Sequence, residues 1–149
     1  MPERRAVKTV LWFDNDPAMI EPYSAALRDE GYTVTIARSI TEANSALESE
    51  TFDLLILDVM IPTFDDAEEE EFSPEETDCG GETGLAFYRR RRQMLSSANT
   101  EVLVITVRLD KAIRDAFIAE GLATERIATK IALRTVDLFL ERVREILGD

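Results

Sequence analysis

The sequence predicts an α/β fold in which a five-stranded parallel sheet carries helices on both faces. Short apolar segments alternate along the chain with amphipathic segments, and five such pairs follow one another. The first, third and fourth apolar segments are almost continuously hydrophobic, which is typical of strands buried on both faces. The length of 149 residues fits a single domain, residues 1–149.

The expected strands are the short apolar segments, at residues 9–13, 32–37, 54–57, 102–107 and 127–129. Expected helix faces have apolar residues at helical spacing: Ile40, Ala43, Ala46 and Leu47, then Leu109, Ile113, Ala116 and Phe117, then Val136, Phe139, Val143 and Ile146. Ser39 and Glu42 form an expected capping box, while Gly31 and Gly121 are placed to end helices with a positive φ.

The first helix is expected to begin at Asp16 and Pro17, with Asp16 as a helix cap. Pro22 lacks the N–H for a backbone bond to the preceding turn, so we expect it to kink or delay this helix.

Right-handed crossovers between alternating strands and helices leave few topologies. They favour a flavodoxin-like, doubly wound sheet with strand order 2-1-3-4-5, whose ligand site lies beyond the carboxyl ends of strands one and three.

Acidic side chains follow both of those strands. Asp14 and Asp16 come after the first strand and Asp58 after the third. Two carboxylates 4 Å apart repel by roughly 4 kcal/mol at an effective dielectric constant near 20, so a cation is expected between them, and oxygen ligands favour Mg²⁺. Thr106 and Lys130 end the fourth and fifth strands, where a hydroxyl and a cation could hold an anionic group.

The segments FDNDP, LLILDVMIP, VLVITV and IATK resemble the response-regulator receiver family over nearly the whole chain, interrupted by one insertion. The resemblance implies that Asp58 is the phosphoacceptor, that Thr106 follows the phosphoryl group and that Lys130 pairs with it. It also matches Gly84 to the glycine that opens the helix after strand three.

The implied metal ligands for Mg²⁺ are Asp14, Asn15, Asp58 and the backbone carbonyl of Met60. The implied partner is a sensor histidine kinase or a phosphotransfer protein, and the implied role is a switch and not an enzyme. Self-association is common in the family through the fourth helix, fifth strand and fifth helix, so a homodimer is one expected assembly.

Four positions depart from the family pattern. Asn15 replaces a carboxylate, so we expect weakened Mg²⁺ affinity. Ile131 replaces a proline, so we expect a trans peptide and a shifted final loop, because a cis bond before a non-proline residue costs about 3–4 kcal/mol. Ile127 stands where an aromatic switch residue is usual. Val107 is bulkier than the customary alanine, which narrows access to the site.

An acidic insertion occupies about residues 63–82, and nine of the fourteen residues from 65 to 78 are Asp or Glu. Such a segment repels itself, so a solvated loop is one expectation. It could instead dock a basic protein partner, fold onto the arginines at 89–92, or recruit Mg²⁺.

Composition excludes several other functions. The net charge of -13 argues against nucleic-acid binding. No apolar run is long enough to cross a membrane and no secretory signal is visible, so a cytoplasmic location is expected. The single Cys79 and the absence of histidine exclude an internal disulfide and zinc or cysteine–histidine chemistry.

Two alternatives remain open. A pseudo-receiver would keep the fold and signal through protein contacts with little or no phosphorylation. The departures at Asn15, Val107, Ile127 and Ile131 favour this alternative. A phosphatase of the haloacid-dehalogenase type is a more distant alternative, because Asp14-x-Asp16 resembles the opening of that family's motif. Asp14 would then be the nucleophile, although Ala18 stands where that family has a threonine.

Overall fold

The computed structural model describes residues 7–61, 82–107 and 110–148. It contains a five-stranded sheet of order β2-β1-β3-β4-β5, in which every adjacent pair is parallel. The strands are β1 (Thr9–Phe13), β2 (Thr33–Ala37), β3 (Leu54–Leu57), β4 (Glu101–Thr106) and β5 (Ile127–Thr129). The doubly wound, flavodoxin-like fold expected from the sequence is therefore confirmed.

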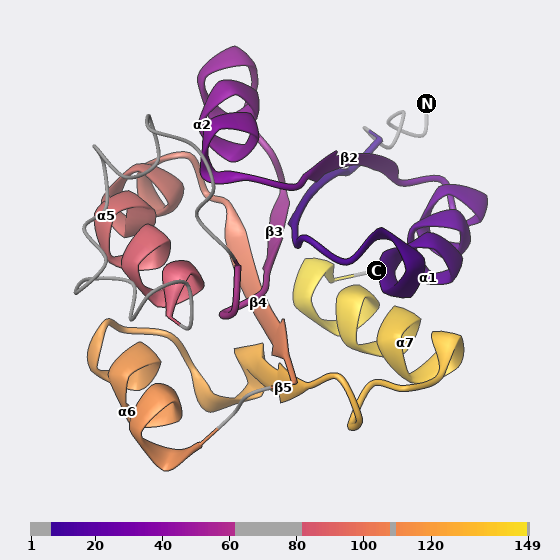
Figure 1. The fold of residues 1–149 in the computed structure, drawn as a ribbon. Helices are drawn as coiled ribbons and strands as arrows, with labels where there is room; N and C mark the ends of the chain where they lie inside the picture. Colours follow the sequence, from indigo (N-terminus) through magenta and orange to yellow (C-terminus); the bar gives the residue numbers. More distant parts are fainter. Residues whose placement is uncertain (1–6, 62–81, 108–109, 149) are drawn as a thin grey trace.

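Helices cover both faces of the sheet, with α2, α5 and α6 on one side and α1 and α7 on the other (Figure 1). Their bounds are α1 (Pro17–Asp29), α2 (Ile40–Ser49), α5 (Thr83–Ser97), α6 (Lys111–Ala119) and α7 (Val136–Leu147), with a short 3₁₀ turn, η1 (Thr124–Arg126), before β5.

Two hydrophobic cores, one on each face, hold these layers together. Alternate residues of a strand point to opposite faces, so Leu11 and Leu55 pack in the core beneath α2, α5 and α6, whereas Trp12 and Ile56 pack beneath α1 and α7. All four are buried. The near-continuous hydrophobicity of these strands follows from this burial on both faces.

Two strand boundaries differ from the expected ones by one residue. Strand β2 begins at Thr33, because the N–H of Tyr32 donates to the carbonyl of Leu27 at the end of α1. Strand β4 is shifted to Glu101–Thr106, since Glu101 pairs with Leu54 of β3. Val107 lies beyond the ladder and is 68% exposed.

The expectation that Pro22 delays the first helix is wrong, since α1 begins at Pro17 and runs through Pro22. A proline removes one backbone hydrogen bond, but Ile20 and Leu27 on the same helix are fully buried against the sheet. Tertiary packing therefore outweighs the local preference of the proline.

The expected helix ends are confirmed. The N–H of Glu42 donates to Oγ of Ser39, and the Glu42 carboxylate accepts from the Ser39 hydroxyl and from the N–H of Arg38. Gly31 and Gly121 have φ values of +97° and +99°, which glycine adopts without strain.

Several predictions lie outside the described residues. These concern the acidic insertion, of which residues 62–81 are not described, together with Cys79 and Leu109. In the part of the chain that is described, no helix is long and apolar enough to cross a membrane.

Candidate functional site

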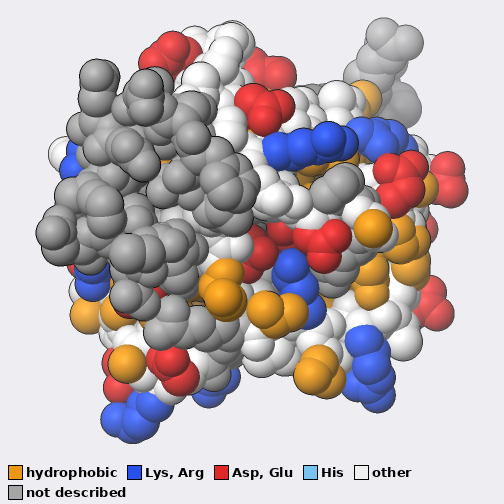
Figure 2. All heavy atoms as spheres, in the orientation of Figure 1, with side chains coloured by type: hydrophobic (Ala, Val, Ile, Leu, Met, Phe, Trp, Pro, Cys, Tyr) orange, Lys and Arg blue, Asp and Glu red, His pale blue; other side chains and the backbone are white. Residues whose placement is uncertain are grey.

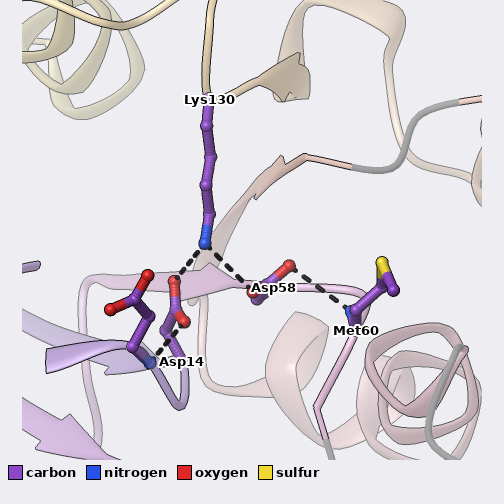
Figure 3. Close-up of polar contacts among 5 residues, drawn as sticks. Asp14, Asp58, Met60 and Lys130 are labelled. Atoms are coloured by element: carbon purple, nitrogen blue, oxygen red, sulfur yellow. Dashed lines mark hydrogen bonds and ion pairs between the residues drawn. The ribbon is translucent and has the colours of Figure 1, made fainter. Parts of the chain in front are cut away.

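Three charged side chains meet at the carboxyl edge of the sheet because each follows directly after a strand. Asp14 follows β1, Asp58 follows β3 and Lys130 follows β5. Carboxyl ends of parallel strands share one edge, so the fold brings together residues that are up to 116 positions apart in a chain of 149. Figure 3 shows Lys130 reaching across to the two carboxylates.

The ammonium of Lys130 lies between the two carboxylates. Its Nζ is 3.1 Å from Oδ2 of Asp14 and 3.2 Å from Oδ2 of Asp58. The side chains of Lys130, Asp14 and Asp58 are only 10%, 2% and 6% exposed. One cation therefore serves two buried anions. In Figure 2, acidic and basic side chains meet near the middle of the visible face.

Backbone N–H groups fix the second oxygen of each carboxylate. The N–H of Asp16 donates to Oδ1 of Asp14 at 3.0 Å, and the N–H of Met60 donates to Oδ1 of Asp58 at 3.4 Å (Figure 3). The ladder also fixes the backbone, since the N–H of Asp58 donates to the carbonyl of Phe13. Both carboxylates are thus held with one oxygen toward Lys130.

Burial and mutual repulsion make the site electrostatically unbalanced. Burial and the Asp58 carboxylate raise the pKa of Asp14 to about 6, although Lys130 acts in the opposite direction. Burial lowers the pKa of Lys130, but Asp58 and Asp14 more than offset this, so its pKa is raised and it stays charged at neutral pH. The two carboxylates need more positive charge than one lysine supplies.

Gly84 allows α5 to approach the end of β3 closely. A Cβ at this position would lie 2.0 Å from the backbone oxygen of Asp58. The Gly84 N–H donates to the carbonyl of Val59 at 2.9 Å, and the hydroxyl of Thr83 donates to the carbonyl of Ile61. Only glycine fits here, which agrees with the match that the sequence implied for Gly84.

The remaining expected site residues take different positions. Thr106 is buried as the last residue of β4, and its carbonyl accepts from the N–H of Lys130 at 2.9 Å. Asn15 donates through Nδ2 to the carbonyl of Arg38 at 3.1 Å. Met60 is partly exposed and its N–H bonds to Asp58.

The departures from the family pattern are also visible. Ile127 is buried, whereas Ile131 is 75% exposed. No cis peptide bond occurs among the described residues, so the bond before Ile131 is trans, as expected. The loop after it is tied to α1, because the Tyr23 hydroxyl donates to the carbonyl of Arg134 at 2.6 Å. The shift of this loop relative to the family stays a prediction.

The donor set partly fits a magnesium ion. Oδ2 of Asp14 is buried, and apart from the ion pair with Lys130 it accepts no hydrogen bond of good geometry from the described residues. A buried carboxylate oxygen with no hydrogen bond beyond this ion pair suits a hard cation. Asp14, Asp58 and the Met60 carbonyl are all oxygen donors. The described residues contain no group of three acidic, cysteine or histidine side chains placed for a metal.

Comparisons with known proteins find similarity to response regulators. Residues 10–68 match the family model described as the response regulator receiver domain. The probable transcriptional regulatory protein TcrX of Mycobacterium tuberculosis is 41% identical over 54 residues, which are 36% of this chain and 23% of that protein. The match thus covers about a quarter of the length of this curated relative.

Solved structures match over nearly the whole chain. A response regulator from Thermotoga maritima is 25% identical with a TM-score of 0.70, covering 97% of this chain and 100% of that one. A CheY-like response regulator receiver domain protein from Methanospirillum hungatei JF-1 has a TM-score of 0.74 at 19% identity, covering 96% and 95%.

Residues 10–68 are thus similar to a response regulator receiver domain, and the chain as a whole has the fold of CheY-like receiver domains.

Sequence reasoning missed one contact at the site. Arg38 follows β2 and its carbonyl holds the amide of Asn15. A backbone carbonyl leaves no trace in residue type, and only the adjacency of β2 to β1 could have indicated that this position lies near Asn15.

Proposed function

We propose that this chain is a phosphorylation switch in which Asp58 accepts a phosphoryl group from a sensor histidine kinase or a phosphotransfer protein. The observation that supports it is the buried pair of Asp14 and Asp58, which share the single ammonium of Lys130 at 3.1 and 3.2 Å. Buried like charges at a strand edge are costly, and they are retained where chemistry needs them.

In the proposed reaction a carboxylate oxygen of Asp58 attacks the phosphorus atom of a phosphohistidine. The new P–O bond forms as the P–N bond breaks, and the imidazole of the donor leaves with the bonding electron pair and takes up a proton. A bound Mg²⁺, held by Asp14, Asp58 and the Met60 carbonyl, would supply positive charge that offsets the phosphoryl oxygens.

Phosphorylation would change the balance of charge around Lys130. A phosphoryl group carries roughly -1.5 to -2 charges, compared with one on the free carboxylate. The ammonium of Lys130 would then pair with the modified Asp58 in preference to Asp14. The hydroxyl of Thr106, from the adjacent strand, would donate to a phosphoryl oxygen. The loop that begins after Lys130 is the segment that would respond.

The chain would thus act as a switch without turnover. We place this switch in the cytoplasm, where a histidine kinase domain or a phosphotransfer protein would reach it. A homodimer is part of the same proposal, because receivers commonly associate with a second copy.

A pseudo-receiver is the second candidate, and one observation favours it. The amide of Asn15 is turned to the carbonyl of Arg38, so this position adds no negative charge for a metal. A module of this kind would signal through protein contacts alone.

The two candidates differ in one assay. The full chain would be incubated with acetyl phosphate with and without Mg²⁺, and its intact mass measured. The receiver predicts the added mass of one phosphoryl group that depends on Mg²⁺ and disappears in Asp58→Asn. No added mass at any Mg²⁺ concentration would establish the pseudo-receiver.

A further inference from the structure

We propose a second binding site, for a small phosphate-bearing anion, in the groove between α5 and the segment that joins α6 to β5. The groove lies at the amino edge of the sheet, because Glu101 at the start of β4 and Arg126 just before β5 both line it. It is therefore remote from Asp58, which follows the carboxyl end of β3.

The groove consists of two adjoining cavities of about 350 Å³ and about 670 Å³. Both are lined by Tyr88, Arg92, Ser96 and Gly121, so they are continuous. Small-molecule sites in proteins have volumes of roughly 300–1,000 Å³. Helices α5 and α6 lie beside each other on the same face of the sheet (Figure 1).

One carboxylate positions two arginines on the wall of the groove. Glu120 accepts from Nε of Arg89 at 3.2 Å and contacts Nε of Arg92 at 3.3 Å. The Glu120 carbonyl accepts from Nη1 of Arg92 at 2.9 Å. Each guanidinium has five N–H donors in a planar fork, so these contacts hold the side chains while leaving donors for a ligand.

A third arginine is fixed on the other side of the groove. Nη1 of Arg126 lies 2.5 Å from Oε2 of Glu101, and the Arg126 side chain is only 25% exposed. Fixing side chains before binding lowers the entropy lost when a ligand is bound.

The charge of the lining identifies the ligand class. Arg89, Arg92 and Arg126 line the two cavities together with the two glutamates Glu101 and Glu120, so positive charge exceeds negative charge in the lining even when Arg90 is left out of the sum. The whole chain has a net charge of -13, so this groove is a local exception. Guanidinium forks bind phosphate oxygens in pairs, and a dianionic or trianionic phosphate would match both the charge and the geometry.

Arg91, which belongs to the same run of four arginines, offers a matched control for substitutions of the arginines that line the groove. Arg91 is turned away from the groove, since Nε and Nη2 donate to Oδ1 of Asn44 at 3.0 and 2.8 Å. Its guanidinium also lies 5.5 Å from the ring centroid of Phe87. Replacement of Arg91 removes the same charge from the same helix without changing the lining of the groove.

The test is a calorimetric titration of the full chain with inorganic pyrophosphate in EDTA. EDTA removes any metal from the Asp58 site, so this result is independent of the proposed phosphorylation. Wild type, Arg92→Gln, Arg89→Gln and Arg91→Gln would be compared at two salt concentrations, with circular dichroism as a check that each variant is folded.

We expect saturable, salt-sensitive binding by wild type and Arg91→Gln, and binding weaker by about tenfold or more in Arg92→Gln and Arg89→Gln. Absence of saturable binding by wild type would overturn the proposal, as would equal weakening in all three variants. Binding of a glutamate-rich peptide with no binding of pyrophosphate would overturn the assigned ligand class. If Arg92→Gln does not fold, Arg89→Gln decides alone.

Discussion

The two edges of the sheet carry inverse arrangements of charge. At the carboxyl edge, one lysine is shared by the two carboxylates of Asp14 and Asp58. At the amino edge, one carboxylate, Glu120, is shared by Arg89 and Arg92. The first group is buried, while the two arginine side chains are 46% and 52% exposed. Each group contains three charged side chains, and the two groups differ in how deeply these side chains are buried.

Burial decides how much each arrangement affects the protein. Water and salt screen exposed pairs, which contribute about 0–1 kcal/mol. Buried charges lose hydration, and their uncompensated repulsion appears directly in stability and in pKa values. We therefore expect substitutions at the carboxyl edge to have large effects and matched substitutions at the amino edge to have small ones.

The largest effect is expected from Gly84→Ala, compared with Gly121→Ala. A methyl group at Gly84 would meet the Asp58 backbone at 2.0 Å, whereas none of the described atoms lies within 4 Å of a Cβ at Gly121. Chemical denaturation should show a loss of about 3 kcal/mol or more for Gly84→Ala, and only about 1–2 kcal/mol for Gly121→Ala, caused by its positive φ. Equal losses would show that α5 does not pack tightly against the backbone of Asp58 at the end of β3.

The next effect is expected from Asp14→Asn in metal-free buffer. The pKa of Asp14 is raised to about 6 from an ordinary 3.8, so its charged form is less favourable in the folded state than in the unfolded state. Removing the charge at pH 8 should raise the free energy of unfolding, by on the order of 2–3 kcal/mol. Destabilisation at pH 8 would contradict the assigned electrostatics.

The pH dependence of the same pair has a defined sign. Between pH 6 and pH 4 the folded protein binds a proton at Asp14 that the unfolded chain does not bind as strongly. Wild type should therefore gain stability relative to Asp14→Asn as the pH falls through 6, and the difference should close near pH 4. Parallel curves across this range would exclude a raised pKa.

A smaller effect is expected from Asn15→Asp. The new carboxylate would face the carbonyl of Arg38 and lose the hydrogen bond from Nδ2, which should cost about 1 kcal/mol without metal. It should also strengthen Mg²⁺ binding by about tenfold, equivalent to about 1.4 kcal/mol. Melting curves with and without Mg²⁺ measure both effects. Unchanged Mg²⁺ affinity would place the metal elsewhere.

The smallest effect is expected from Glu120→Gln, which removes a charge from the amino edge as Asp14→Asn does from the carboxyl edge. Its partners are exposed, so the free energy of unfolding should change by less than about 1 kcal/mol, and 1 M salt should remove most of the difference. If Glu120→Gln changed the free energy of unfolding as much as Asp14→Asn does, the proposed difference in electrostatic effect between the two edges of the sheet would be wrong.

The sequence was sufficient for the sheet and for the three charged residues of the site. Asp14, Asp58 and Lys130 each follow a strand directly, so a correct strand order placed them at one edge. The sequence was insufficient where a contact depends on backbone geometry. The hydrogen bond from Asn15 to the carbonyl of Arg38 is such a contact. The expected delay of the first helix at Pro22 does not occur, because the buried Ile20 and Leu27 outweigh one missing hydrogen bond.

The amino-edge groove also could not be predicted in detail. Four consecutive arginines were visible in the sequence, but helical geometry alone does not show that Arg89 and Arg92 pair with Glu120 while Arg91 contacts Asn44. That division depends on how α5 packs against α2 and α6.

The most direct test asks which of the two carboxylates takes the phosphoryl group. The chain would be treated with acetyl phosphate and Mg²⁺ and reduced with borodeuteride, which converts an aspartyl phosphate to deuterated homoserine, and the peptides would be sequenced by tandem mass spectrometry. We predict deuterated homoserine at position 58 alone, with Asp14 unmodified. Label at position 14 would indicate the chemistry of a haloacid-dehalogenase-type phosphatase, and that result would contradict the assignment of Asp58.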